Sequence, residues 1–123
     1  MEKENKNWQD VLREKYAPQI EAWKKQYGTV KAFFIEDSDN SGRVVFFKIP
    51  TRQQLSASES LGFDAATGSH DLYKKSERLI VDCMIGGDIE VQAILNDTPL
   101  FLSTGNFVLY NLVEQKKTNW ETC

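Results

Sequence analysis

The pattern of apolar residues predicts an amphipathic helical segment at the start of the chain. Apolar side chains recur there at intervals of three and four, with Lys, Glu and Gln between them. They are Trp8, Val11, Leu12, Tyr16, Ile20, Trp23 and Tyr27. Pro18 interrupts the pattern, and the residue before a proline is biased away from the helical conformation. We therefore expect a kink or two short helices meeting near Ala17, with Gly28 ending the segment.

A β-hairpin is predicted next, over about 29–49. The runs 29–36 and 43–49 are rich in aromatic and β-branched residues, and the polar stretch 37–42 between them favours a turn. Each run carries two adjacent phenylalanines, whose side chains point to opposite faces of a strand. A two-stranded ribbon that is apolar on both faces is not stable alone in water. We expect helices, further strands or another chain to cover both faces.

Three to four helices are predicted after Pro50. Thr51 can cap the first helix. The stretch 62–68 has the composition of a loop or a frayed helix end, and Ser69 can cap the next helix, which Gly86 and Gly87 end. The inward-facing positions of these two helices are predicted to be Leu55, Ser58 and Leu61 in the first, and Leu72, Ser76, Leu79, Ile80 and Cys83 in the second.

The segment 89–95 fits two structures, because its apolar residues suit both a short helix capped by Asp88 and an alternating third strand. We favour the helix. Asp97 and Pro99 open a last helix, since proline is tolerated in a first helical turn. Gly105 is a weak point of that helix. Its apolar face is predicted to hold Phe101, Val108, Leu109, Leu112 and Val113.

The predicted fold is α+β, with the hairpin packed against an N-terminal helix and three to four C-terminal helices. The length of 123 residues and the ordinary fractions of apolar (41%) and charged (27%) residues predict one domain over 1–123. Within it, 1–28 is an N-terminal helical segment and 29–123 holds the hairpin and the other helices.

Charge and hydropathy argue against nucleic acid and membranes as binding partners. The formal net charge is −3, and neither end of the chain has the concentrated positive charge that nucleic-acid binding needs. No apolar run approaches the roughly 20 residues of a membrane-spanning helix, and the polar N-terminus lacks the pattern of a signal peptide. We expect a cytoplasmic protein that binds neither nucleic acid nor membrane.

Candidate chemistry is sparse. The stretch 37–42 imitates the start of a calcium-binding loop, but Lys48 stands where such a loop needs glutamate. His70 and Asp71 could form an acid–base pair, although adjacent residues of a helix diverge. Two cysteines and one histidine cannot complete a four-ligand metal site, and Cys83 is expected to be a small buried apolar group. We therefore predict a protein that is not an enzyme and has no catalytic residues, metal or cofactor.

The three tryptophans raise the question of partner binding, because tryptophan dominates contact energies at interfaces and also anchors cores. The core interpretation is favoured for Trp8 and Trp23, and the surface interpretation for Trp120, which follows a polar stretch. The candidate partner-binding residues are Trp8, Trp23, Phe101 and Trp120.

The order of these patterns resembles that of small tail assembly chaperone-like proteins of bacteriophages and prophages. The resemblance rests on 46–52 (FFKIPTR), 83–88 (CMIGGD) and 100–103 (LFLS), and it covers roughly residues 30–117. It implies a non-enzymatic factor that acts in the cytoplasm of the bacterial host. Such a factor would bind another phage protein, of the tape-measure type, during tail morphogenesis.

Other functions stay open on the sequence alone. A structural virion component, such as a neck, connector or tail-completion protein, would show the same features. A small cytoplasmic ligand-binding domain or enzyme would require a pocket around His70 or Asp88. Homo-oligomerisation is open as well, because another chain could cover the apolar hairpin.

Overall fold

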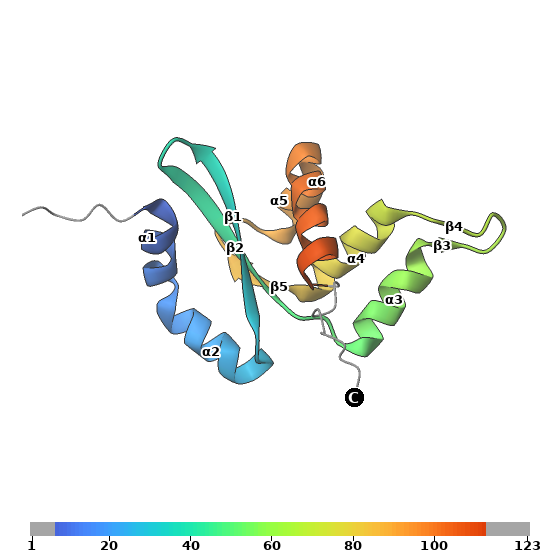
Figure 1. The fold of residues 1–123 in the computed structure, drawn as a ribbon, viewed down its shortest axis with the longest axis horizontal. Coiled ribbons are helices and arrows are strands. Elements are labelled where there is room, and N and C mark those ends of the chain that lie inside the picture. Colours follow the sequence, from blue (N-terminus) through green and yellow to red (C-terminus); the bar gives the residue numbers. More distant parts are fainter. Residues whose placement is uncertain (1–6, 113–123) are drawn as a thin grey trace, which may run out of the picture.

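A three-stranded antiparallel sheet lies between two groups of helices in the computed structural model, which describes residues 7–112 (Figure 1). The fold is α+β, as predicted. In chain order the elements are α1 (Trp8–Lys15), α2 (Ala17–Tyr27), β1 (Val30–Ser38), β2 (Ser41–Lys48), α3 (Arg52–Gly62), β3 (Phe63–Asp64), β4 (Ser69–His70), α4 (Leu72–Cys83), β5 (Met84–Gly87), α5 (Val91–Asn96), α6 (Thr98–Phe107) and the π-helical turn η1 (Val108–Leu112).

The N-terminal segment is broken into two helices, as the proline predicted. The break falls at Tyr16, whose φ of −98° and ψ of 7° lie outside the helical range. Pro18 then occupies the first turn of α2, where its missing N–H removes no helical hydrogen bond. Gly28 ends α2 with a φ of +86°, a conformation that favours glycine.

The predicted hairpin is present, and its strands are longer than expected. Ser38 pairs with Ser41, so that only Asp39 and Asn40 form the turn, and Asn40 takes the left-handed conformation with a φ of 67°. The register shifts around Asp37, whose two carboxylate oxygens accept hydrogen bonds of 2.8 Å from the Arg43 guanidinium. The acidic stretch 37–42 is therefore part of a hairpin and its turn.

A third strand follows α4, and here the sequence prediction was wrong. We expected the second helix after the hairpin to continue to Gly86, but α4 ends at Cys83, and β5 pairs antiparallel with β2. The segment 89–95 holds the helix α5, which was the favoured alternative. Gly87 has a φ of +136°, and a Cβ there would lie 2.6 Å from the Cα of Val45, so glycine is required where β5 meets β2.

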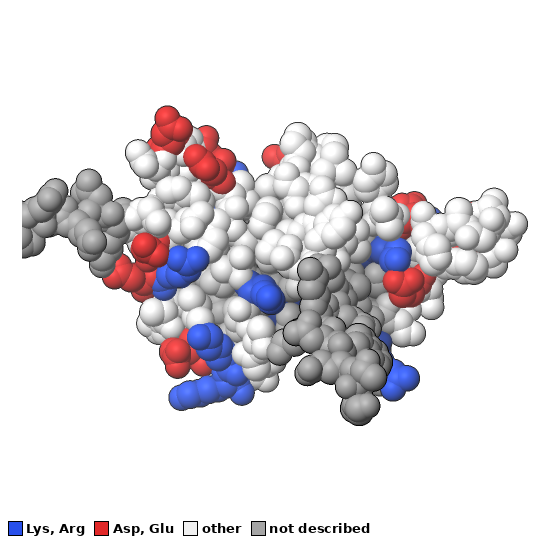
Figure 2. Space-filling model, viewed as in Figure 1, with Lys and Arg blue, Asp and Glu red and all other residues white. Residues whose placement is uncertain are grey.

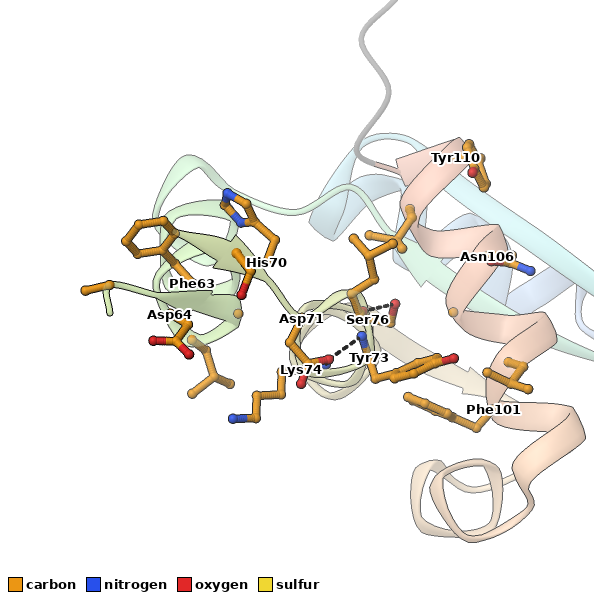
Figure 3. Close-up of a pocket in the computed structure, with 18 residues that line it drawn as sticks. Phe63, Asp64, His70, Asp71, Tyr73, Lys74, Ser76, Phe101, Asn106 and Tyr110 are labelled. Carbon is orange, nitrogen blue, oxygen red and sulfur yellow. Dashed lines mark hydrogen bonds between the residues drawn. The ribbon is translucent and has the colours of Figure 1, made fainter. Parts of the chain in front are cut away.

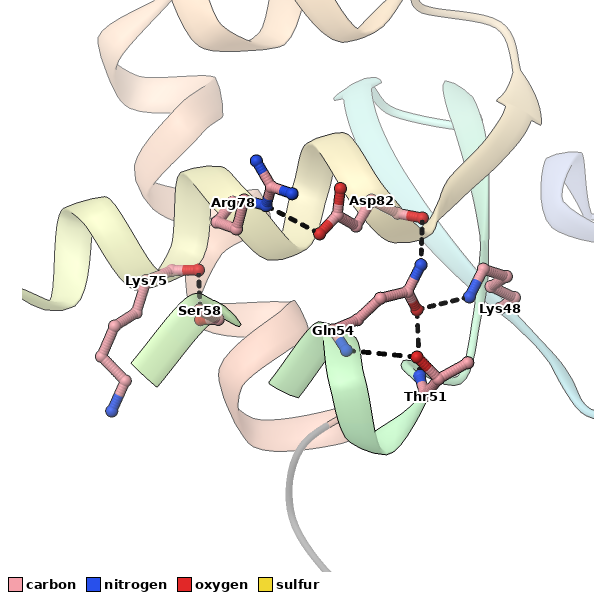
Figure 4. Close-up of polar contacts among 7 residues, drawn as sticks. All are labelled: Lys48, Thr51, Gln54, Ser58, Lys75, Arg78 and Asp82. Carbon is pink, nitrogen blue, oxygen red and sulfur yellow. Dashed lines mark hydrogen bonds and ion pairs between the residues drawn. The ribbon is translucent and has the colours of Figure 1, made fainter. Parts of the chain in front are cut away.

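The predicted cap of α3 is confirmed and is extended by a larger polar network (Figure 4). The Gln54 amide oxygen accepts hydrogen bonds from the Thr51 backbone N–H at 2.9 Å and from the Lys48 ammonium at 2.6 Å. Its amide nitrogen donates to the Asp82 carbonyl at 3.5 Å. This one side chain therefore joins the end of β2, the start of α3 and the end of α4.

The connection between α3 and α4 differs from the prediction. The expected loop is a short β3–β4 hairpin that projects from the body of the molecule (Figure 1). Ser69 lies in β4 and caps nothing; Asp71 caps α4, accepting hydrogen bonds from the N–H groups of Tyr73 and Lys74. Leu61 and Leu72 were predicted to face inward but are 52% and 56% exposed, because the core does not extend to where this hairpin begins and ends.

Helices of the same chain cover both faces of the β1–β2 ribbon. α1 and α2 lie on one face, and α4 and α6 lie on the other (Figure 1). The central residues of β2, Val44 to Phe47, are at most 1% exposed. The main core cluster consists of Val45, Phe47, Leu79, Ile80, Cys83, Ile89, Ile94, Val108 and Leu112. Burial raises the pKa of the Cys83 thiol to about 11, which fits its predicted role as an apolar core residue.

The weak point expected at Gly105 is a point of close helix packing. A Cβ at Gly105 would lie 3.1 Å from the Cβ of Ser76, so the glycine lets α6 approach α4. Both positions are buried. The neighbouring Thr104 hydroxyl is also buried and has no hydrogen-bond partner among the described residues. Val113, predicted on the same helix face, lies outside residues 7–112.

Candidate functional site

An open groove of about 1060 Å³ lies between the β3–β4 hairpin, the first turns of α4 and the outer side of α6 and η1 (Figure 3). Phe63 and His70 project from the hairpin on one side, and Asn106 and Tyr110 lie on the opposite wall. Tyr73 lies beside Phe101, with 6.4 Å between their ring centroids. We call this feature the groove.

Most of the large apolar side chains that lie exposed within residues 7–112 line the groove. They are Leu61, Phe63, Leu72, Tyr73, Leu102 and Tyr110. Tyr73 is 63% exposed and Tyr110 is 67% exposed, so these rings are held at the surface with little packed against them. Single exposed apolar residues are ordinary, but a contiguous group of them marks an interaction surface.

The groove also carries little charge. α6 and η1 contain no Asp, Glu, Lys or Arg, and Figure 2 shows a broad uncharged surface over α6. Among the lining residues only Asp64, Asp71 and Lys74 carry full charges, and the Asp71 carboxylate already accepts two backbone hydrogen bonds of α4. Depletion of charge together with enrichment of aromatic residues is typical of the centre of a protein interface.

Close contacts between α3 and α4 hold the elements that form the groove in place. The Asp71 N–H donates to the Gly62 carbonyl at 2.6 Å, and the Ser58 hydroxyl donates to the Lys75 carbonyl at 3.0 Å. Lys75 also forms an ion pair of 2.8 Å with Glu59. The groove is therefore built on a paired α3–α4 unit, on which α6 packs.

Within residues 7–112, acid–base and metal chemistry have little basis in the groove. His70 lies exposed in β4, with its ring centroid 5.2 Å from that of Phe63, and Asp71 caps α4. No group of three His, Cys, Asp or Glu side chains in the described part of the chain could hold a metal ion. The same range contains no helix with the length and hydropathy to cross a membrane. The groove offers exposed aromatic and aliphatic side chains together with polar groups.

The predicted partner-binding residues do not gather on one surface. Trp8 and Trp23 are half-buried on the sheet face opposite α4 and α6, with ring centroids 5.8 Å from Phe34 and 5.2 Å from Phe46. Of the three candidates in the described range, Phe101 lies in the groove. Trp120 lies outside the described residues.

Both tryptophans fit over glycines of the sheet. A Cβ at Gly42 would lie 2.6 Å from the Trp8 ring, and one at Gly86 would lie 2.7 Å from the Trp23 ring. The sheet is therefore notched where α1 and α2 pack, and these indoles hold the two helices in place. We call α1 and α2 together the N-terminal cover.

Asp88 also fastens the N-terminal cover, which corrects its predicted role as the cap of α5. The carboxylate accepts hydrogen bonds from the Tyr16 hydroxyl at 2.6 Å and from the Val44 N–H at 2.9 Å, while Lys15 lies 3.5 Å away. Burial, and then the hydrogen bond and negative charge of Asp88, raise the pKa of Tyr16 to about 12. Asp88 therefore joins the cover to the sheet.

The sequence prediction missed most of the groove. A signal was present in the run 98–113, which contains no charged residue in spite of its length. A second signal was the position of Phe63 and Tyr73 outside the predicted inward-facing stripes. The sequence does not show that these two segments form one surface, because the β3–β4 hairpin and α6 come together only in the folded chain.

The groove thus combines exposed aromatic rings, an uncharged wall and a base of packed helices. No protein-family model matches the chain, and neither a curated protein nor a solved structure was found to be similar to it.

Proposed function

We propose that this protein is a non-enzymatic phage assembly factor that binds another phage protein through the groove. The observation that carries the proposal is the group of exposed apolar side chains, Tyr73 and Tyr110 foremost, around an uncharged wall. The partner proposed is a tape-measure type protein during tail morphogenesis, as the resemblance to tail assembly chaperone-like proteins implies.

Burial of apolar surface is the energetic basis of this binding. Covering a previously exposed Leu or Phe side chain contributes about 1.5–3 kcal/mol, and a few such residues dominate a typical interface. An amphipathic helix of the partner can lay its apolar face into such a groove. Because α6 and η1 offer no charges, selectivity would come from shape and from polar groups at the rim, such as Lys74 and Asn106.

The resemblance and the groove support different parts of the proposal. The resembling segments 46–52 and 83–88 lie in β2, the cap of α3, β5 and the Asp88 contacts, and all of these build the fold. They support a shared framework and the kind of partner. The third resembling segment, 100–103, contributes Phe101 and Leu102 to the groove. The rest of the groove lies outside the three segments, and the groove supports the place of binding.

Co-expression with the tape-measure protein of the phage that encodes this chain tests the proposal. The wild-type chain should keep that protein soluble and elute with it in size-exclusion chromatography. The double variant Tyr73→Asp/Tyr110→Asp should lose the complex, because both aspartates would be buried against the apolar partner. Tyr27→Asp is the matched control, since Tyr27 is exposed on α2, away from the groove.

Two results would contradict the proposal. One is an unchanged complex with the groove variant, provided that its thermal midpoint equals that of the control. The other is the presence of the chain in mature phage particles at a fixed copy number, which would identify it as a structural virion component. An assembly factor of the chaperone kind should be absent from finished particles.

A further inference from the structure

The outer edge of β1 is open. In the sheet order β1–β2–β5, β1 has a neighbour on one side only. Within residues 7–112, no hydrogen bond joins the backbone of its outer edge to another element. An edge strand of this kind presents a row of free N–H and C=O groups that can pair with another strand.

The middle of β1 lacks the features that usually protect such an edge. Its residues Ala32, Phe33, Phe34 and Ile35 remain half-buried, whereas the β2 residues that face the first three of them, Phe46, Val45 and Val44, are fully buried. Among the residues of β1 itself, charge and a bulge are confined to the two ends, at Lys31 and around Asp37, while Arg13 of α1 lies over one face of the Phe34 ring, 4.8 Å from its centroid. A consecutive apolar stretch on an unprotected edge is a site for strand pairing.

Space for incoming side chains is present beside this edge. A second cavity, of about 420 Å³, lies between β1 and the start of α6. Phe33 and Ile35 line it from the strand, and Pro99, Leu100 and Ser103 line it from the helix. A strand added to β1 would direct every second side chain toward this cavity.

Charge along the edge indicates which strand would fit. The hairpin-tip end of β1 carries the exposed acids Glu36 and Asp37, the second of them paired with Arg43, and Asp39 follows in the turn. The opposite end of β1 carries Lys31. Lys24 and Lys25 at the end of α2 add positive charge there; Figure 2 shows acidic residues at the hairpin tip and basic residues at the far end of the cover. A second β1 running antiparallel places its acidic end beside the basic end of the first, at both ends of the pair.

We propose that two copies of this chain pair through their β1 edges, antiparallel and around a two-fold axis perpendicular to the sheet. This joins the two three-stranded sheets into one continuous sheet. The axis keeps both N-terminal covers on one face and both α4–α6 layers on the other. Phe33 and Ile35 of each copy then approach the cavity beside α6 of the other. This interface is separate from the groove and does not depend on the function proposed for it.

Sedimentation equilibrium over a range of protein and salt concentrations tests the pairing. The wild-type chain should be a dimer that weakens with salt. Lys31→Glu should raise the dimer dissociation constant about tenfold at low salt, because two opposite-charge contacts become repulsive. Lys74→Glu makes the same charge change at the groove, away from β1, and should leave the constant unchanged.

Hydrogen–deuterium exchange locates the interface without any substitution. Amides of β1 should exchange more slowly as protein concentration rises, while those of β5 at the other edge should not change. A chain that stays monomeric at the highest concentration overturns the proposal, as does a dimer that is indifferent to Lys31→Glu with unchanged β1 exchange. Protection of β1 only when a different protein is bound would also overturn it, and would assign the edge to an extended segment of that partner.

Discussion

The N-terminal cover and the groove are both rich in aromatic side chains, but the structure uses them in opposite ways. In the cover, Trp8, Tyr16 and Trp23 pack on the sheet, and Gly42 and Gly86 leave room for the indoles. In the groove, the Tyr73 and Tyr110 rings are mostly exposed and no hydrogen bond from either hydroxyl fixes it to another described residue.

The difference shows that the surroundings of an aromatic residue, and not its presence alone, decide whether it packs in the fold or is available to bind a partner. A packing ring meets a matching notch, as the Trp8 and Trp23 indoles meet Gly42 and Gly86, or a polar contact, as the Tyr16 hydroxyl meets Asp88. A binding ring is held in place by its backbone and leaves its own surface uncovered. Substitutions in the cover should therefore lower stability, and those in the groove should lower binding while stability is kept.

The largest expected loss of stability is for Trp23→Ala. This change removes the contact with Phe46 and leaves a cavity above Gly86, so we expect the free energy of unfolding to fall by about 3 kcal/mol. Tyr110→Ala should change it by less than about 0.5 kcal/mol, as is typical of exposed positions. Urea denaturation measures both. Equal losses in the two variants would remove the distinction between cover and groove.

Removal of one hydroxyl from the cover should have a smaller effect. Tyr16→Phe deletes the hydrogen bond to the Asp88 carboxylate and should cost about 2 kcal/mol at neutral pH, the usual scale for a bond to a charged group. Chemical denaturation at pH 7 measures this cost. An unchanged free energy of unfolding would show that the hydroxyl does not help to fasten the cover.

The same hydroxyl gives the cover a pH dependence. Unfolded Tyr16 loses its proton near its ordinary pKa of 10.0, whereas the folded state keeps the proton up to a pKa of about 12. The contribution of this group is therefore complete below pH 10 and is lost as pH rises to about 12. The difference in unfolding free energy between wild type and Tyr16→Phe should shrink over that window; a constant difference would contradict the assignment.

A substitution of Thr104 is expected to have the opposite sign, a gain of stability smaller than the losses in the cover. The buried hydroxyl has no partner among the described residues, so it is desolvated without compensation. Thr104→Val keeps the shape and removes the polar group, and we expect a gain of about 1 kcal/mol in thermal or urea denaturation. A loss of stability would mean that the hydroxyl is satisfied after all. Thr104→Val should leave partner binding by the groove unchanged.

The parts of the fold that were predictable depend on local chemistry. The helix break near Pro18, the hairpin and the cap at Thr51 all follow from residues close in sequence. β5 could not be predicted, because the two glycines of Met84–Gly87 give it little strand propensity. The segment forms a strand through tertiary contacts: it pairs with β2, and Gly86 leaves room for the Trp23 ring.

The candidate site was less predictable than the fold. Helical periodicity identified the side on which Leu61 and Leu72 lie, but it could not reveal that no other element within residues 7–112 buries these two side chains. For Trp8 and Trp23 the sequence left packing and partner binding open, and the notches at Gly42 and Gly86 show the packing. Phe101 was the one candidate partner-binding residue that lies in the groove, and His70 and Asp71, weighed from the sequence as a possible acid–base pair, also line it. The other lining residues come from segments that meet only in the folded chain.

The most direct test of the account is site-specific photo-crosslinking with the tape-measure type protein that we propose as the partner. A photoreactive phenylalanine analogue is placed at Tyr110, and in a separate sample at Tyr27 of the cover. The account predicts a cross-link to the partner from position 110 and none from position 27. Cross-linking from position 27 with none from position 110 would contradict it and would place binding on the cover.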